Sequence, residues 1–274
     1  MKLFPSVYSL KSIAGCALLA ACCAPSVQAQ VTPVTLTSGT STAMVDVDSS
    51  LGMYHWDVSG QNQLNRQWFY YQVNGSGPSP VNAISAANWS QPTANSLNTV
   101  YNNGLYNVSI GYTLIGQSAG LADINEDISI QNTSGGTLTF TFFQYSDFNL
   151  GGTPGGDTVT MDNYDAFQQK GTTAIVEGII DPAADHFEAN TIGGPGSTLA
   201  RLNGVSPVAL LDFTSASGDV SWAYEWDLTL ENGQTALILK DKALSVQLIP
   251  EPSSLAIAGV GLAAWAIRRR SARA

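Results

Sequence analysis

Four carboxylates of this sequence could supply acid–base chemistry on a sugar: Asp147, Glu177, Glu188 and Glu225. Hydrolysis of a glycosidic bond needs two carboxyl groups on either side of that bond, and their separation decides whether the reaction retains or inverts the configuration. The sequence does not give the distances between the four residues. They are therefore a set of candidates for a glycan-modifying enzyme, without a defined pair.

His186 lies between two carboxylates, Asp185 and Glu188. Such a side chain can act as a general base, but a place in a charged surface turn is the favoured interpretation. The only other histidine is His55, which excludes a zinc site built from several histidines. The sequence also contains neither the Gly-x-Ser-x-Gly elbow of serine hydrolases nor the Walker loop that binds phosphates.

Two segments carry oxygen ligands at spacings that suit calcium. Residues 123–127 have the spacing that opens an EF-hand loop, but the glycine and the glutamate that complete such a loop are absent, which favours an exposed acidic strand face. The second segment contains Asp157, Asp162 and Asp165 and could wrap an ion. We expect a domain without a cofactor, with calcium at the second segment as the alternative.

Charge is unevenly distributed along the chain. Between Gln30 and Ile249 there are five Lys and Arg residues and 20 Asp and Glu residues, a net charge of −15. A surface of this sign repels nucleic-acid phosphates and anionic lipid headgroups, so neither is expected as a partner. Cysteine occurs only at positions 16, 22 and 23, which leaves this part of the chain without a disulfide or a thiolate metal site.

The elements that would position the candidate groups are β-strands. Apolar residues alternate with polar ones over many short stretches, the pattern of strands with one buried face. The clearest stretches are Tyr106 to Leu114, Leu138 to Phe142 and Trp222 to Leu230. Turn-forming pairs such as Asn74-Gly75 and Asn232-Gly233 separate them. We therefore predict one all-β domain over residues 30–248, an antiparallel β-sandwich or a jelly-roll-like pair of sheets.

Aromatic residues are the remaining clue to a ligand. Trp222, Tyr224 and Trp226 share one face of a strand, which in a sandwich favours the core. Residues 66–71 place aromatic rings on both faces of one strand, so part of that strand is expected to be covered or used. Residues 144–148, Gln-Tyr-Ser-Asp-Phe, resemble a segment of secreted β-sandwich domains that bind or rearrange sugars, although they are too short to name a family.

The first 29 residues have the three-part pattern of a secretory signal peptide, an N-terminal helix that export removes. Two lysines precede an apolar run, and small residues at positions 27 and 29 form a cleavage site. We predict cleavage after Ala29, so that the mature chain begins at Gln30. Residues 19–22 are also compatible with a lipobox, in which Cys22 would be acylated and become the new N-terminus. Cleavage after Ala29 is the favoured alternative.

Residues 249–274 contain three parts in order. Pro250, Glu251 and Pro252 come first, and the prolines hold the backbone extended, as a peptide in an enzyme cleft requires. An uncharged stretch follows, which as a transmembrane helix would be about 20 Å long, a marginal span for a hydrocarbon core of about 30 Å. A cluster of arginines then stops translocation and keeps that end in the cytoplasm; it includes Arg268, Arg269 and Arg270.

These three parts resemble the PEP-CTERM sorting signal of Gram-negative bacteria. The resemblance implies processing by exosortase, a membrane-integral cysteine peptidase, with cleavage near Pro250 to Pro252. It also implies that the chain is held briefly in the inner membrane and then passes to the cell surface or the extracellular matrix. Signal peptidase is the other processing partner that the two ends of the chain imply.

The export and sorting signals, together with the composition, predict a non-enzymatic protein of the surface or matrix, associated with exopolysaccharide or a biofilm. A carbohydrate-binding β-sandwich module is the alternative, and a glycan-modifying enzyme is the third hypothesis because the sequence shows no catalytic constellation. A groove lined by Trp and Tyr would favour binding, whereas two facing carboxylates in a cleft would favour catalysis.

Overall fold

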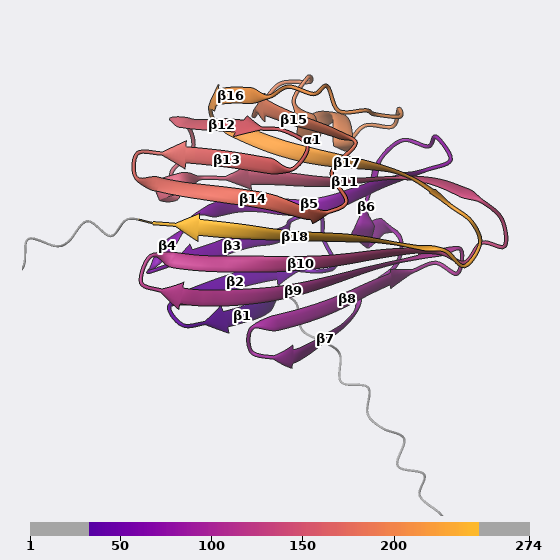
Figure 1. Cartoon of the computed structure of the whole chain (residues 1–274), viewed down its shortest axis with the longest axis horizontal. Coiled ribbons are helices and arrows are strands. Elements are labelled where there is room, and N and C mark those ends of the chain that lie inside the picture. The colour runs from indigo at the N-terminus through magenta and orange to yellow at the C-terminus, as the bar shows by residue number, and fades with distance from the viewer. Residues whose placement is uncertain (1–32, 247–274) are drawn as a thin grey trace, which may run out of the picture. The chain divides into compact units, whose positions relative to one another are not determined.

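Strands with one buried face form almost all of the part that the computed structural model describes, residues 33–246. They build two large sheets, antiparallel except for a short parallel contact, which pack face to face (Figure 1). The predicted all-β sandwich is thereby confirmed. The predicted signal peptide, its cleavage site at Ala29 and Gln30, the sorting motif and the arginine cluster lie outside the described residues. Within residues 33–246 no helix is long and apolar enough to cross a membrane.

The first sheet provides the strands that matter most for the candidate site. Along its main path it contains, in order, β1 (Val34–Ser38), β2 (Ser41–Asp46), β3 (Gly52–Val58), β5 (Leu64–Val73), β11 (Leu138–Phe148), β17 (Val220–Leu230) and β15 (His186–Thr191). Two short strands extend it: β4 (Gln61–Asn62) beside β3, and β6 (Ser79–Pro80) beside β5.

The second sheet covers one face of the first. Its order is β16 (Ser215–Gly218), β12 (Asp157–Met161), β13 (Asp165–Lys170), β14 (Thr173–Asp181), β18 (Thr235–Ser245), β10 (Leu121–Asn132), β9 (Tyr106–Ser118), β8 (Ser96–Asn102) and β7 (Asn88–Thr93). Short helical turns lie in the connections: η1 (Val81–Ala83), η2 (Leu150–Gly152) and α1 (Thr198–Leu202).

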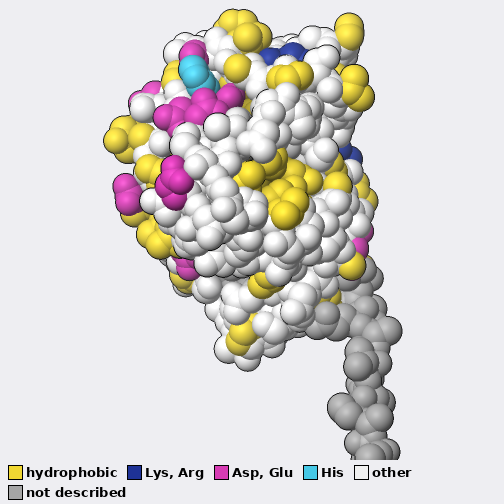
Figure 2. Space-filling view, turned by 90° about the vertical axis from the view of Figure 1, so that its right-hand side faces the viewer, with side chains coloured by type: hydrophobic (Ala, Val, Ile, Leu, Met, Phe, Trp, Pro, Cys, Tyr) yellow, Lys and Arg dark blue, Asp and Glu magenta, His cyan; other side chains and the backbone are white. Residues whose placement is uncertain are grey.

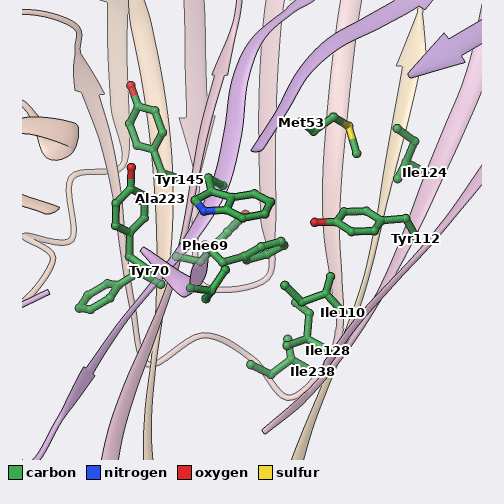
Figure 3. Packing of buried hydrophobic residues seen from close by; sticks show 14 of the residues in the cluster. Met53, Phe69, Tyr70, Ile110, Tyr112, Ile124, Ile128, Tyr145, Ala223 and Ile238 are labelled. Atoms are coloured by element: carbon green, nitrogen blue, oxygen red, sulfur yellow. The ribbon is translucent and has the colours of Figure 1, made fainter. Parts of the chain in front are cut away.

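Apolar alternation fixes the register of the strands. On the second sheet Ile110, Ile128 and Ile238 lie directly opposite one another on β9, β10 and β18, and all three are buried. Figure 3 shows them on the inner side of their strands, across the core from Phe69. Because side chains alternate with a period of two, a shift by one residue would expose this whole row.

Stacked aromatic rings fill the layer between the sheets. Trp222 on β17 stacks on Phe148 with a centroid distance of 5.3 Å, and Phe69 on β5 stacks on Phe142 at 5.5 Å. Such pairs add about 0.5–1.5 kcal/mol each beyond the apolar area that they bury. Trp222, Tyr224 and Trp226 all lie in this core, on the face that their alternation selects.

Four charged side chains lie among these rings, and we call them the buried ion cluster: Glu126, Glu177, Lys240 and Lys242. Each lysine of β18 faces a carboxylate on a neighbouring strand, because Lys240 pairs in register with Glu126 of β10 and Lys242 with Glu177 of β14. The ammonium groups also cross over: Lys240 Nζ lies 3.0 Å from Glu177 Oε1, and Lys242 Nζ lies 2.7 Å from Glu126 Oε2.

Two groups of the first sheet complete this cluster. Trp222 Nε1 donates to Glu177 Oε2 at 2.7 Å, and Gln144 Nε2 donates to Glu177 Oε1 at 2.6 Å. Burial alone would raise the pKa of Glu177, but the two ammonium groups and the hydrogen bond from Gln144 lower it to about 2. The charges therefore cancel inside the sandwich, which is the condition under which buried ions are tolerated.

We predict that Lys240→Met lowers the free energy of unfolding by about 3–5 kcal/mol, because it leaves two buried carboxylates with one cation. Denaturant unfolding of the purified protein measures this loss. The double variant Lys240→Met with Glu126→Gln removes one charge of each sign, so we expect it to be more stable than the single variant. If the unfolding free energy of the single variant fell by less than about 1 kcal/mol, the cluster would contribute little to stability.

Candidate functional site

The side of the first sheet that points away from the core carries a second set of buried side chains, which we call the outer face. It comprises the buried Trp68, Tyr70, Gln72, Phe143, Tyr145, Asp147, Glu188, Ser221 and Glu225, together with the half-buried Arg66. These residues alternate with core residues along β5, β11, β17 and β15. Tyr145 lies opposite Ala223, which lies opposite Glu188. All residues from 142 to 148 are buried, so both faces of β11 are covered.

Asp147 is a nearly buried carboxylate of the outer face, with 3% of its surface exposed. Its Oδ2 accepts a hydrogen bond from Asn65 Nδ2 at 2.8 Å, whereas Oδ1 has no partner among the described residues. Burial raises the pKa of Asp147 to about 6; Asn65 and Arg66 oppose this shift, and the charge of Asp219 adds to it. A carboxyl group with such a pKa can take up or release a proton near neutral pH.

Two tyrosines share the outer face with this carboxylate, and Tyr145 interacts with it directly. Tyr70 and Tyr145 leave neighbouring strands on the same side, and their hydroxyl groups point the same way (Figure 3). The Tyr145 hydroxyl interacts with Ser221, and that of Tyr70 interacts with Arg66. Burial raises the pKa of both phenols, so both keep their protons at neutral pH. The positive charge of Arg66 opposes this rise at both.

We call these five residues the polar end of the outer face: Arg66, Tyr70, Tyr145, Asp147 and Ser221. They combine a proton-exchanging carboxyl group, two phenol donors, a hydroxyl and one cation. Buried polar atoms without a protein partner are rare in native structures and are common where water or a ligand completes the hydrogen bonds. Asp147 contributes such an atom, its Oδ1. The exposed Asn65 and the half-buried Arg66 place this end near the surface.

Residues 203–213, which we call the strap, cross the other end of the outer face. Glu188 on β15 forms an ion pair with Arg201 and accepts the backbone N–H of Leu211 at 3.0 Å. On β5, Gln72 holds Val208 through two hydrogen bonds, one to its carbonyl at 2.9 Å and one from its N–H at 2.7 Å. Since β15 and β5 are the outer strands of this group of four, the strap spans β17 and β11 between them.

Glu225 lies under the strap, and its Oε2 accepts the N–H of Leu210 at 2.6 Å. Burial raises the pKa of Glu225 to about 7; the hydrogen bond from Leu210 opposes this rise and the charge of Asp227 adds to it. His186 pairs in register with Glu225, and its Nδ1 lies 3.0 Å from Asp212 Oδ2. The hydrogen bond with Asp212 raises the pKa of His186. The part of the outer face under the strap therefore also contains a carboxyl group, Glu225, that can bind or release a proton near neutral pH.

The carboxylates named from the sequence divide between the two sides of the first sheet. Asp147, Glu188 and Glu225 share the outer face, whereas Glu177 is a member of the buried ion cluster and is separated from them by the sheet. Glu188 is bound by Arg201, Thr198 and backbone donors and serves to hold the strap. Sequence reasoning did not single out Tyr70, whose only signal was the run of aromatics on both faces of residues 66–71.

The calcium candidates do not converge. Asp162 Oδ1 accepts the N–H groups of Tyr164 and Asp165 and so closes the turn between β12 and β13. Asp157 is buried on β12, where it accepts a hydrogen bond from Gln168 at 3.0 Å and lies 3.9 Å from Lys170 Nζ. Within residues 33–246 no three His, Cys, Asp or Glu side chains gather as metal ligands would.

Beyond the strap, the outer face continues as a shallow surface depression. It has a volume of about 220 Å³ and is lined by Thr139, Phe140, Thr141, Asp227, Leu228 and Thr229. Thr141 donates to Asp227 at 2.9 Å. Figure 2 shows that acidic side chains gather near a histidine on one side of the domain and that Lys and Arg side chains are sparse there. The acidic surface and the scarcity of Lys and Arg are both unfavourable for binding a polyanion.

Comparison with known proteins separates the tail from the domain. The family model of the PEP-CTERM protein-sorting motif matches residues 248–270, and the predicted resemblance is thereby confirmed. No curated protein matches the chain. Among solved structures, an aldose 1-epimerase candidate of Escherichia coli K12 has a TM-score of 0.54 at 11% identity, over 80% of this chain and 99% of its own.

Two further structures match at similar levels. A bacterial glucoamylase in complex with acarbose has a TM-score of 0.54 at 9% identity, over 86% of this chain and 36% of its own. A galactose mutarotase related enzyme of Lactobacillus acidophilus has a TM-score of 0.50 at 8% identity, over 79% of this chain and 100% of its own. At such identities the likeness shows the fold.

These matches correct two expectations from the sequence, the matrix function and the absence of enzymatic activity. A non-enzymatic matrix protein was predicted, but the solved structures that share this domain's fold are sugar-processing enzymes. The prediction of a purely structural, non-enzymatic protein is therefore overturned. The prediction failed because the relationship lies in the arrangement of strands, and 8–11% identity leaves no motif that a single sequence could display.

The raised pKa values predict how stability depends on pH. Glu225 and Asp147 are more easily ionised in the unfolded chain than in the fold, so their contribution is complete below about pH 4 and is lost as the pH rises to 7. We expect Glu225→Gln, which keeps an acceptor for Leu210, to flatten this fall in the unfolding free energy. Chemical denaturation at several pH values measures it, with the exposed Asp127→Asn as the control. An unchanged slope for Glu225→Gln would contradict the assignment.

Proposed function

We propose that this protein is exported and that its β-sandwich domain modifies a sugar, with the polar end of the outer face as the site of acid–base chemistry. The observation that carries the proposal is Asp147, a buried carboxyl group with an unpartnered oxygen and a pKa of about 6, which interacts with the phenol of Tyr145. The fold shared with aldose epimerase-like enzymes supports the choice of a sugar as substrate.

The side chains of the polar end suit proton transfer at a sugar hemiacetal. Opening such a ring requires a base that accepts the proton of the anomeric hydroxyl and an acid that protonates the ring oxygen. Above about pH 6 Asp147 is ionised and can serve as the base. Tyr70 and Tyr145 remain protonated and can donate to the opposite side of the sugar, while Arg66 can bind a hydroxyl near the surface.

A carbohydrate-binding module without catalysis is the second candidate. It is favoured by Glu188 and Glu225, because both accept hydrogen bonds from the strap and neither supplies a free second carboxylate next to Asp147. A lectin-like site needs polar donors, and Tyr70, Tyr145 and Arg66 provide hydroxyl and guanidinium donors of this kind. The two candidates share one site and differ only in whether bound sugar is turned over.

We predict that the full chain accelerates interconversion of the anomers of an aldose and that Asp147→Asn reduces the rate at least 100-fold, within the range for loss of a general base. Exchange NMR with glucose, galactose and their oligosaccharides measures the rate. Tyr145→Phe should reduce it about tenfold, and the activity should rise with pH through about 6. Asp127→Asn, an exposed carboxylate on β10, is the matched control.

The outcomes separate the candidates. Sugar binding by saturation-transfer NMR without turnover, abolished by Asp147→Asn, would assign a binding module. Turnover that survives both Asp147→Asn and Tyr145→Phe would place the chemistry elsewhere. Neither turnover nor binding with the whole panel would contradict the carbohydrate proposal.

The ends of the chain support a route to the cell surface. The PEP-CTERM motif implies export and surface sorting by exosortase. We infer further that signal peptidase cleaves between Ala29 and Gln30, that exosortase acts at Pro250 to Pro252, and that Arg268, Arg269 and Arg270 retain the tail on the cytoplasmic side until then. An extracellular glycan is the sugar that a protein on this route would meet.

Replacement of Pro250, Glu251 and Pro252 by alanines should leave a full-length precursor in the inner membrane, because the motif that the protease reads is gone. Membrane fractionation with intact mass measurement checks this. A variant that reaches the surface at the normal processed length would contradict processing at this motif.

A further inference from the structure

The folded domain ends very close to the sorting motif. Val246 is 9% exposed, and its N–H donates to the carbonyl of Gly120 at 2.7 Å, so the fold holds the chain up to this residue. Three residues, Gln247 to Ile249, separate it from Pro250. Four residue steps span at most about 14 Å when fully extended. Any enzyme that grips Pro250 therefore works within that distance of the sandwich.

The last strand cannot peel away to lengthen this connection. β18 lies inside the second sheet, paired along its length with β10 and over its second half with β14. Its side chains Lys240 and Lys242 belong to the buried ion cluster, so detaching the strand would leave Glu126 and Glu177 buried without cations. Such a loss costs several kcal/mol. The protease must accept the domain in its folded form.

We call the turns around Val246 the exit end; they lie on the left in Figure 1, where the arrow of β18 ends. The exit end comprises residues 38–40, 59–61, 117–121, 151–154 and 170–173. Hydrogen bonds tie these turns together: Gly120 N–H donates to Ser59 Oγ at 2.7 Å, and Lys170 Nζ donates to the Thr153 carbonyl at 2.6 Å.

A close approach makes the exit end rigid. A Cβ on Gly116, the residue just before the turn 117–121, would lie 2.0 Å from the carbonyl oxygen of Ser38, so only glycine lets the two sheets meet here. The N–H of Gly116 also donates to Ser38 Oγ at 3.0 Å. The surface next to the exit point is therefore a fixed shape.

The composition of the exit end differs from that of the domain. Its turns consist of Gly, Ser, Thr, Gln, Ala, Pro and Leu with one lysine, Lys170, and contain no Asp or Glu, although residues 30–249 carry a net charge of −15. The nearest carboxylates are engaged: Asp57 accepts the N–H of Gly60, Asp123 accepts from Gln117, and Asp157 lies beside Lys170. One further carboxylate, the half-buried Asp219 between β16 and β17, lies next to Gly155 at this end of the domain.

We propose that the exit end is the surface with which the folded domain docks on the membrane-embedded sorting protease while its tail is cut. The short connection forces contact, and the small uncharged side chains suit close approach to a protein surface at an anionic membrane. The proposal rests on the processing at Pro250 to Pro252 inferred above. It does not depend on the sugar chemistry, although the polar end lies at the same end of the first sheet, where the charge of Asp219 raises the pKa of Asp147.

The test adds negative charge to the exit end and also lengthens the connection between the domain and the sorting motif, in a host that carries exosortase. We expect Ala119→Asp with Thr172→Asp, two exposed positions of the exit end, to slow precursor processing at least threefold in a pulse-chase measurement. A 12-residue Gly-Ser insertion after Val246 moves the domain away from the protease, so the same acidic variant should then be processed at the rate of the unsubstituted chain with that insertion. Asn103→Asp, an exposed turn position between β8 and β9, is the matched control and should leave the rate unchanged.

Three results would overturn the proposal. One is an acidic variant that is processed at the normal rate with its native spacing. Another is a defect that the insertion fails to relieve. The third is a defect that disappears in a host depleted of phosphatidylglycerol, since the surface would then face lipid. Replacing Pro-Glu-Pro by alanines should block processing with and without the insertion, and processing that survives this change would refute the motif itself. Thermal unfolding of each purified variant confirms that the fold is intact.

Discussion

The balance of four charges inside the sandwich constrains the rest of the structure. Two lysines on β18 face two carboxylates on the strands at either side, and the groups also bond across these pairs. A slip of β18 by one residue would turn both ammonium groups to solvent and leave the carboxylates buried without partners. The cluster therefore selects one register. Through Gln144 and Trp222 it also fixes β11 and β17 of the opposite sheet.

Because β11 and β17 are fixed from the core side, their alternate residues present a defined outer face. A strand that is covered on both faces exposes neither face to water. In β11 every residue from 142 to 148 is accordingly buried. Polar groups on such a strand need partners or a function. On the core side Gln144 Nε2 donates to Ser146, and on the other side Asp147 accepts from Asn65 through one oxygen and keeps the other unpartnered. The candidate site thus arises where a doubly covered strand carries a carboxylate.

Much of the architecture could be predicted from the residues. Apolar alternation with a period of two predicts the strands, and the turn-forming glycine pairs predict the turns. Asp147, Glu188 and Glu225 are candidates from the sequence alone, and the structure places all three on one face of the first sheet. The placement of Glu177 could not be predicted, because its acidic character suggests solvent and only the three-dimensional pairing with Lys240 and Lys242 explains its burial. The partnership of Tyr70 with the polar end likewise depends on long-range strand pairing, which local sequence does not encode.

The way in which the strap is attached has a consequence for how such domains diversify. The side chains that hold it, on Gln72, Glu225, Glu188 and Arg201, bind backbone groups of residues 208–211. Backbone amides and carbonyls are present whatever the residue type, so substitutions at residues 208–211 leave these anchors in place, whereas Asp212 holds His186 through its own side chain. Mutational drift can therefore alter the side chains that border the outer face at little thermodynamic cost, while the strands that hold the chemistry stay unchanged. A scaffold built this way separates the capacity to evolve new ligand preferences from the maintenance of the fold.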